Sequence, residues 1–231
     1  RIANRFDLHG TNCVIDAACA SSLAAAHLAI KELLSGDSDL VVTGGVQTAS
    51  TPMMFMCFTK TPAVSPSGTC RPFDNESDGM IIGEGVGLIA LRRLSDAERD
   101  GNQILAVIRG LGTSSDGKGK SIYAPEPEGQ VRAIRRAYEQ AGYGPETVEL
   151  LEAHGTGTKA GDAAEIKSSS KVFSEGNPNS SKWCAIGSVK SQIGHTAGAA
   201  GSASLIKAVL ALHHKILPPT INVRNPTEQV D

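Results

Sequence analysis

The sequence has few aromatic residues, little net charge and no long hydrophobic run. Phe, Trp and Tyr together make up 4% of the 231 residues, and the formal net charge is -2 at pH 7. Few rings leave few platforms for stacked bases, and a nearly neutral chain has no general attraction for nucleic acid or anionic lipid. No apolar stretch is long enough to cross a bilayer. These features argue against nucleic acid or a membrane as a partner.

Cysteines are few, odd in number and scattered. The five are Cys13, Cys19, Cys57, Cys70 and Cys184, and no two of them form a Cys-x-x-Cys pair. A disulfide framework or a structural zinc site is therefore not expected. A reducing, cytoplasmic compartment is the expected location.

Short apolar runs alternate with amphipathic segments along the chain. Strands are expected at 39–43, 83–91, 104–111, 148–153 and 184–186, and helices after Cys19 as far as Gly36, at 128–142, at 162–173 and after residue 200. This alternation predicts the α/β class with a mostly parallel sheet, in which 39–43 is a buried strand. Because the pattern restarts near Ile104, two similar halves are expected, over residues 1–103 and 104–231.

Two further segments are open to more than one interpretation. Residues 53–58 are apolar and rich in sulfur, which favours core filler over the lining of a hydrophobic channel. Residues 216–223 contain Pro218 and Pro219, which is typical of an edge strand.

Cys19 has small neighbours and stands where an extended run gives way to a helix. The alanine-rich segment after it carries Leu23, His27 and Ile30 at helical spacing. Free N–H groups and the dipole at a helix start stabilise a thiolate, so this position predicts a lowered pKa and a nucleophile. The alternative is packing, because free cysteines are among the most buried residues.

Two glycine-rich segments resemble nucleotide-binding loops and are rejected. Residues 112–119 have the P-loop spacing, but Gly119 stands where a magnesium-binding Ser or Thr is needed, and Asp116 would repel phosphate. The glycines of 155–161 are spaced one residue too long for a dinucleotide fingerprint. A nucleotide-dependent oxidoreductase remains an alternative that requires saturable NAD(P) binding.

His154 and His195 each follow a short apolar strand and open a glycine-containing turn. Parallel α/β sheets present functional groups at this edge. One such histidine is usually structural, but two together with a cysteine suit thioester chemistry, in which neutral imidazoles donate hydrogen bonds to an oxyanion or enolate. Lys190 adds positive charge, with Glu165 as its motif partner. The alternatives are a solvated lysine and a helix cap made by Asp162 and Glu165.

Three segments resemble, in order, the active-site signatures of the β-ketoacyl synthase domains of type I polyketide and fatty acid synthases. They are residues 16–22 around Cys19, 152–158 around His154, and 187–196, which hold both Lys190 and His195. The resemblance covers essentially the whole chain. Residues 118–125 and 161–165 are most similar to the ketosynthases of polyunsaturated fatty acid synthases, with enediyne-type iterative synthases next.

This resemblance implies a thiolase-like fold of two related halves packed as five α/β layers, normally in a homodimer. It implies that Cys19 accepts an acyl chain from the phosphopantetheine of an acyl carrier protein, and that the synthase itself holds no cofactor or metal. His154 and His195 would assist decarboxylation of a carrier-bound malonyl thioester and stabilise the enolate, which lengthens the acyl chain by two carbons. Lys190 and Glu165 match the family's supporting ion pair.

Two related functions compete with this one. A noncatalytic ketosynthase-like subunit, which only dimerises and shapes chain length, is expected to lack Cys19. A thiolase uses a Cys-His-Cys site, and His195 fits the condensing arrangement better.

The first and last residues predict a fragment. The sequence begins with Arg1 and stops at Asp231, before the Gly-Phe-Gly-Gly segment with which the family completes its oxyanion hole. The fold is therefore expected to be truncated at both ends, and the chain expressed alone to fold poorly or to be inactive.

Overall fold

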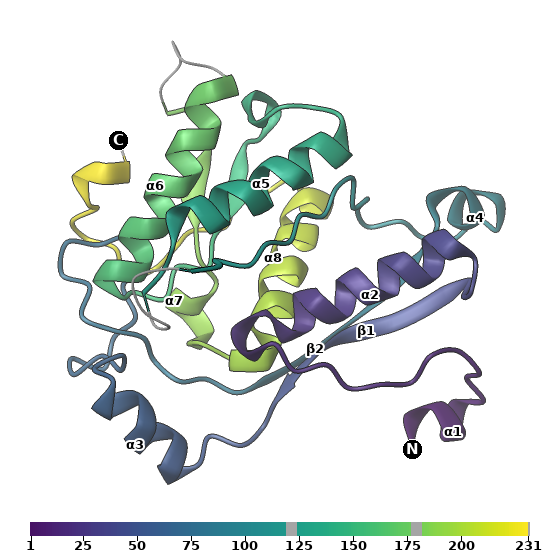
Figure 1. Ribbon diagram of the computed structural model, residues 1–231, viewed down its shortest axis with the longest axis horizontal. Coiled ribbons are helices and arrows are strands. Elements are labelled where there is room, and N and C mark those ends of the chain that lie inside the picture. Colours follow the sequence, from purple (N-terminus) through teal and green to yellow (C-terminus); the bar gives the residue numbers. More distant parts are fainter. Residues whose placement is uncertain (119–123, 177–181, 231) are drawn as a thin grey trace.

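The computed structural model describes residues 1–118, 124–176 and 182–230 (Figure 1). The helices are α1 (Ile2–Phe6), α2 (Ser21–Ser35), α3 (Pro52–Lys60), α4 (Leu94–Arg99), α5 (Pro127–Ala141), α6 (Lys159–Gly176), α7 (Lys190–Ile193) and α8 (Ala200–His214). The strands are β1 (Leu40–Gln47), β2 (Gly85–Arg92), β3 (Leu150–Glu152) and β4 (Ala185–Gly187). Short 3-10 turns lie at Ala18–Ala20, Pro145–Thr147, Ala197–Ala199 and Glu228–Val230. Within these ranges no helix is long and apolar enough to cross a membrane.

Strands β1 and β2 form an antiparallel pair, in register from Leu40 opposite Arg92 to Gln47 opposite Gly85. Helices α2 and α8 pack on one face of this pair (Figure 1). The other face carries exposed apolar side chains, namely Leu40, Val42, Val46, Val86 and Leu88. The prediction of a buried parallel strand at 39–43 is therefore wrong, because β1 pairs antiparallel and is covered by helices on one side only.

Gly45 and Gly87 lie opposite each other and let the two helices approach the sheet closely. A Cβ at Gly45 would lie 2.8 Å from the Ser22 Cβ, and one at Gly87 would lie 2.6 Å from the Ser202 Oγ. The N–H of Ser202 donates to the Ser22 Oγ at 2.9 Å, which joins the starts of α2 and α8. This packing brings the segment around Ser22 and the segment around Ser202, 180 residues apart in the sequence, together on one face of the sheet.

Strands β3 and β4 form a parallel pair, from Leu150 opposite Ala185 to Glu152 opposite Gly187. Helices α5 and α6 pack on each other (Figure 1), around a core of Val131, Val172 and Phe173. These elements confirm the predicted α/β class, the strands at 148–153 and 184–186, and the helices at 128–142 and 162–173. Helix α6 begins at Lys159, before the predicted start.

Residues 104–111 form no strand within the described part of the chain, contrary to the prediction. The backbone here runs along α5 instead of along another strand. The N–H of Leu111 donates to the Gln140 side chain at 2.7 Å, and Arg136 donates to the Thr113 carbonyl at 2.6 Å. Among the described residues no strand pairs with this stretch.

Residues 216–223 also form no strand, so the predicted edge strand is wrong. Pro218 and Pro219 have no N–H to donate to a ladder. Asn222 turns the chain with a φ of 67° and donates to the carbonyl oxygens of Cys70 and Ser191. Side-chain anchors therefore hold this segment in place of strand pairing.

Helix α3 contains the sulfur-rich residues 53–58 and projects from the body of the molecule (Figure 1). Thr51 caps its start by accepting the Met54 N–H at 3.3 Å, and Pro52 occupies the first turn. Met53 and Met56 are 70% and 61% exposed. The expectation of core filler is wrong for this segment. Most of the subfamily-specific stretch 118–125 lies outside the described residues.

A methyl group at Gly45 should destabilise the packing of α2 and α8. In Gly45→Ala the new Cβ would lie 2.4 Å from the Gly198 carbonyl oxygen, and overpacking of this kind costs about 1–3 kcal/mol. Gly85→Ala is the matched control, since its Cβ would make an ordinary 3.4 Å contact with Thr196. Urea unfolding of the native protein should give a lower midpoint for Gly45→Ala alone, and equal midpoints would contradict this account.

Candidate active site

Cys19 lies in the 3-10 turn Ala18–Ala20, directly before α2. The turn is built by side chains on either side of it. Asp16 accepts the Ala18 N–H at 2.9 Å, and the Ser21 hydroxyl accepts the Ala17 N–H at 2.9 Å. Ala18 has a φ of 51°, in the left-handed region that is uncommon for residues other than glycine. The turn presents the half-buried thiol of Cys19 at the start of the helix.

Burial raises the pKa of Cys19, while the charge of Lys190 and the backbone of Cys19 itself lower it by smaller amounts. The predicted lowered pKa is therefore wrong, because desolvation of the thiolate outweighs the favourable charges around it. The site therefore favours the neutral thiol over the thiolate.

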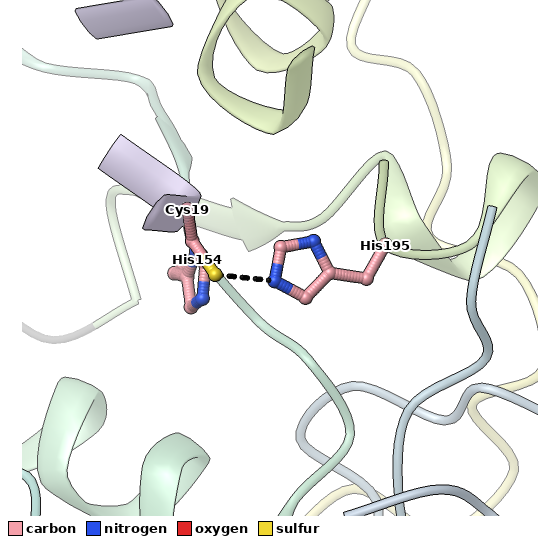
Figure 2. Close-up of side chains that lie close together, drawn as sticks. All are labelled: Cys19, His154 and His195. Atoms are coloured by element: carbon pink, nitrogen blue, oxygen red, sulfur yellow. Dashed lines mark hydrogen bonds between the residues drawn. The ribbon is translucent and has the colours of Figure 1, made fainter. Parts of the chain in front are cut away.

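His195 lies 3.1 Å from Cys19, measured from Nε2 to Sγ (Figure 2). Its ring is only 5% exposed, and burial followed by the charge of Lys190 lowers its pKa to about 4. The N–H of Ala197 donates to the Nδ1 at 3.2 Å. Because Nδ1 accepts a hydrogen bond, the neutral ring carries its proton on Nε2. His195 thus points an N–H donor at the thiol.

His154 follows β3 and lies beside Cys19 and His195 (Figure 2). Its ring centroid is 5.2 Å from that of His195, with the planes at 87°. Burial, Lys190 and His195, in that order, lower the pKa of His154, so this ring too is neutral at pH 7. Unlike His195, His154 keeps an exposed face through which a substrate can reach it.

Glu165 fixes the backbone at His154. Its carboxylate accepts the N–H of His154 at 2.5 Å and the N–H of Gly155 at 2.8 Å. Burial raises the pKa of Glu165, and these two N–H groups and Lys190 oppose that rise. The helix cap weighed for Asp162 and Glu165 is wrong, since α6 begins at Lys159 and both carboxylates reach out of the helix to the loop.

Asp162 holds the same loop from the other side. Its carboxylate accepts the N–H of Phe73 at 2.8 Å and the N–H of Gly157 at 3.2 Å. The side chain is 4% exposed, and burial raises its pKa to about 6. Asp162 therefore ties the loop after β3 to the segment around Phe73.

Lys190 begins α7 beneath the site and is 2% exposed. Burial lowers its pKa, and the carboxylates of Glu165 and Glu152 oppose that decrease. Both oxygens of Glu165 bind backbone N–H groups, so in the described chain Glu165 acts on Lys190 through its charge. The structure thus brings Lys190 close enough to influence the thiol and both histidines electrostatically.

The donor atoms of Cys19, His154 and His195 lie within 4.8 Å of one another, close enough for a metal ion to be considered. A histidine that binds a metal through one nitrogen usually donates the proton on its other nitrogen to an acceptor. The Nδ1 of His195 accepts the Ala197 N–H instead, so its Nε2 keeps the proton. This tautomer fits a hydrogen-bond donor better than a metal ligand.

Family comparison agrees with the sequence motifs. Residues 1–97 match the family model described as "Beta-ketoacyl synthase, N-terminal domain", and residues 105–224 match "Beta-ketoacyl synthase, C-terminal domain". The chain belongs to the β-ketoacyl synthase family.

Curated relatives include two large synthases. This ketosynthase chain is 50% identical, over its whole length, to 8% of a polyunsaturated fatty acid synthase polypeptide of Thraustochytrium sp.. It is 42% identical, again over its whole length, to 5% of the polyketide synthase PksL of Bacillus subtilis. The ketosynthase chain therefore spans a small part of each of these relatives.

Solved structures confirm the fold. The ketosynthase from module 6 of the bacillaene synthase of Bacillus subtilis matches with a TM-score of 0.96 and 42% identity, covering 100% of this chain and 41% of that one. The oxazolomycin ketosynthase domain OzmH KS7 of Streptomyces albus matches with a TM-score of 0.95 and 38% identity, covering 100% and 40%. This ketosynthase chain has their thiolase-like fold.

The structure brings together all the residues proposed from the sequence and adds others. Asp162 appeared in the sequence only as a helix cap. Ser188 had no assigned role, yet its hydroxyl donates to the His154 carbonyl at 3.2 Å and accepts the Lys190 N–H at 3.3 Å. The sequence feature that could have pointed to Ser188 is its position in the glycine-containing turn, two residues before Lys190.

Replacing Lys190 by Met should make Cys19 of the ketosynthase less reactive near neutral pH. Because the Lys190 charge lowers the pKa of Cys19, its loss raises that pKa and reduces the thiolate fraction. Alkylation by iodoacetamide near neutral pH should slow severalfold, because the thiolate is the form that reacts. Lys31→Met, at an exposed position on α2, is the control. An unchanged alkylation rate in Lys190→Met would contradict the electrostatic role assigned to Lys190.

Proposed function

We propose that this chain carries the catalytic residues of a ketosynthase that performs decarboxylative Claisen condensation. The main support is the cluster of side chains itself. The Cys19 sulfur lies 3.1 Å from the Nε2 of His195, and the ring of His154 lies against that of His195. Cys19 is the nucleophile, and His154 and His195 are the donors to the developing enolate. Lys190 and Glu165 support them through charge and backbone position.

The first step transfers an acyl group to Cys19. The Cys19 thiol gives up its proton, and the thiolate attacks the carbonyl carbon of an acyl thioester on the phosphopantetheine of an acyl carrier protein. A new carbon–sulfur bond forms, the bond to the carrier sulfur breaks, and the departing carrier thiolate takes up a proton, so the exchange is neutral overall. The nearby Lys190 charge and the N–H groups at the start of α2 stabilise the thiolate against the cost of burial. The protein itself needs no bound cofactor for this exchange.

The second step forms the carbon–carbon bond. A carrier-bound malonyl thioester loses carbon dioxide, and the electron pair of the broken bond moves into an enolate whose oxygen accepts hydrogen bonds from the two histidines. The enolate carbon attacks the acyl carbonyl on Cys19, and the sulfur leaves. The product is a β-ketoacyl chain that is two carbons longer and remains on the carrier. The Nε2 proton of His195, set by Ala197, supports this role.

Competing functions fit the site less well. A noncatalytic chain-length subunit has no use for a thiol clustered with two neutral imidazoles. A dinucleotide-binding role for the loop after His154 conflicts with its contacts. The N–H of Gly155 donates to Glu165 and the N–H of Gly157 donates to Asp162, so neither is free to donate to a phosphate.

The wider setting is also part of this proposal. Residues 1–103 and 104–231 are the two related halves, and the ketosynthase works as a cytoplasmic homodimer with an acyl carrier protein. Support for a polyunsaturated fatty acid or polyketide pathway comes from the relatives at 50% and 42% identity. The matches to separate N- and C-terminal family models support the division into halves.

The chain expressed alone should fold poorly and lack condensing activity. Its antiparallel pair exposes apolar side chains on the face that no described helix covers, and apolar surface left in water lowers the free energy of unfolding. Malonyl decarboxylation by the purified 231-residue chain should be undetectable beside that of the native synthase. Robust decarboxylation by the isolated chain would refute this expectation.

Site variants of the native protein test the proposed chemistry. His154→Ala and His195→Ala should each slow malonyl decarboxylation by about 100- to 1000-fold, the usual cost of removing one oxyanion donor. His213→Ala, an exposed histidine of α8, is the control and should keep the native rate. Cerulenin should modify the native protein at Cys19, and Cys19→Ala should abolish labelling. Unchanged labelling in Cys19→Ala would sink the assignment of the nucleophile.

A further inference from the structure

A second pair of buried charges lies near the site and touches none of the three clustered side chains. Lys207 of α8 contacts Glu152, the last residue of β3, with 2.6 Å between Nζ and Oε2. Their side chains are 8% and 6% exposed. Removing two charges from water costs several kcal/mol per ion, so a buried pair is weak evidence for a purely stabilising role.

Glu152 joins the two segments that carry His154 and Lys190. Its other carboxylate oxygen accepts the N–H of Val189 at 2.7 Å. Val189 directly precedes Lys190, and Glu152, at the end of β3, stands two residues before His154. One carboxylate therefore connects α8, the end of β3 and the turn into α7.

Further bonds tie these segments together around Glu152. The N–H of Ala153 donates to the Gly187 carbonyl at 2.8 Å, and the hydroxyl of Ser188 donates to the His154 carbonyl at 3.2 Å. A displacement of the Val189 backbone is therefore transmitted both to Lys190 and to the His154 loop.

Lys207 also determines where the Glu152 charge acts. Burial lowers the pKa of Lys190, and the charges of Glu165 and Glu152 oppose that decrease, so both carboxylates act on the same ammonium group. With Lys207 as its direct partner, Glu152 stays directed at α8 and at Val189, and Glu165 keeps its place at His154.

We propose that Lys207 and Glu152 are positioning residues, which hold His154 and Lys190 in the geometry needed for malonyl decarboxylation. This inference rests on the proposed function and extends it to a pair of residues that need not touch the substrate. Without Lys207 the buried Glu152 carboxylate has lost its partner, turns toward Lys190 and releases the Val189 N–H.

The test compares variants of the native synthase. Lys207→Met removes one charge, Glu152→Gln/Lys207→Met removes both while the Gln oxygen can still accept the Val189 N–H, and Lys207→Arg keeps the pair. Lys171→Met breaks an exposed Lys–Glu pair of 2.7 Å and is the matched control. Malonyl decarboxylation, Cys19 alkylation by iodoacetamide and the melting temperature are measured for each variant.

Lys207→Met should lower decarboxylation by about tenfold or more, in the range of measured couplings within buried networks. It should slow Cys19 alkylation less than it slows decarboxylation, and by no more than Lys190→Met does, because a redirected Glu152 only partly offsets the Lys190 charge. The double variant and Lys207→Arg should recover most of the lost decarboxylation. Lys171→Met should match the native protein in all three measurements.

Three results would overturn the positioning role. The first is a native decarboxylation rate in Lys207→Met. The second is an equal loss of decarboxylation and Cys19 alkylation, which would indicate general damage to the fold. The third is a double variant that folds but stays inactive. If Lys207→Met does not fold, the double variant decides between the outcomes. A native protein that cannot decarboxylate malonyl thioesters instead contradicts the proposed function itself.

Discussion

One hydrogen bond, from the Ala197 N–H to the Nδ1 of His195, determines the chemistry of this site. It places the imidazole proton on Nε2, 3.1 Å from the Cys19 sulfur. Burial keeps the ring neutral at pH 7, so His195 donates a hydrogen bond without carrying charge. To act as a base or as a metal ligand toward Cys19, the Nε2 of His195 would have to be unprotonated. The backbone contact at Nδ1 places the proton on Nε2 and so favours stabilisation of an oxyanion.

Buried carboxylates then supply the framework in which the two histidines meet. Glu165, Asp162 and Glu152 each bind backbone N–H groups of the segments that carry His154 and Lys190. Burial raises the pKa of Glu165 and of Asp162, which shows that these positions are costly for an ionised group. These charged side chains lie in an interior where apolar ones would pack at lower cost, because they fix the backbone of the loops that carry His154 and Lys190.

The sequence predicted the reactive side chains better than their surroundings. Cys19, His154 and His195 stood in short motifs whose chemistry requires those residues, so their convergence could be anticipated. The direction of the pKa shift of Cys19 could not be predicted. Its desolvation depends on segments more than 100 residues away in the sequence, as the contact with His195 illustrates. Strand 39–43 was assigned a parallel partner because apolar runs reveal burial but not pairing direction. The anchor roles of Glu152 and Lys207 depend on a contact across 55 residues that no local pattern encodes.

The tautomer of His195 is the most direct test of the account. Nitrogen-15 chemical shifts of histidine-labelled native protein at pH 7 distinguish the two neutral forms and the imidazolium, and a His195→Asn variant assigns the signal. The account predicts a neutral ring with its proton on Nε2 and an unprotonated, hydrogen-bonded Nδ1. A proton on Nδ1 alone, or a charged ring at that pH, would contradict the proposed role of His195 as a neutral donor to the enolate.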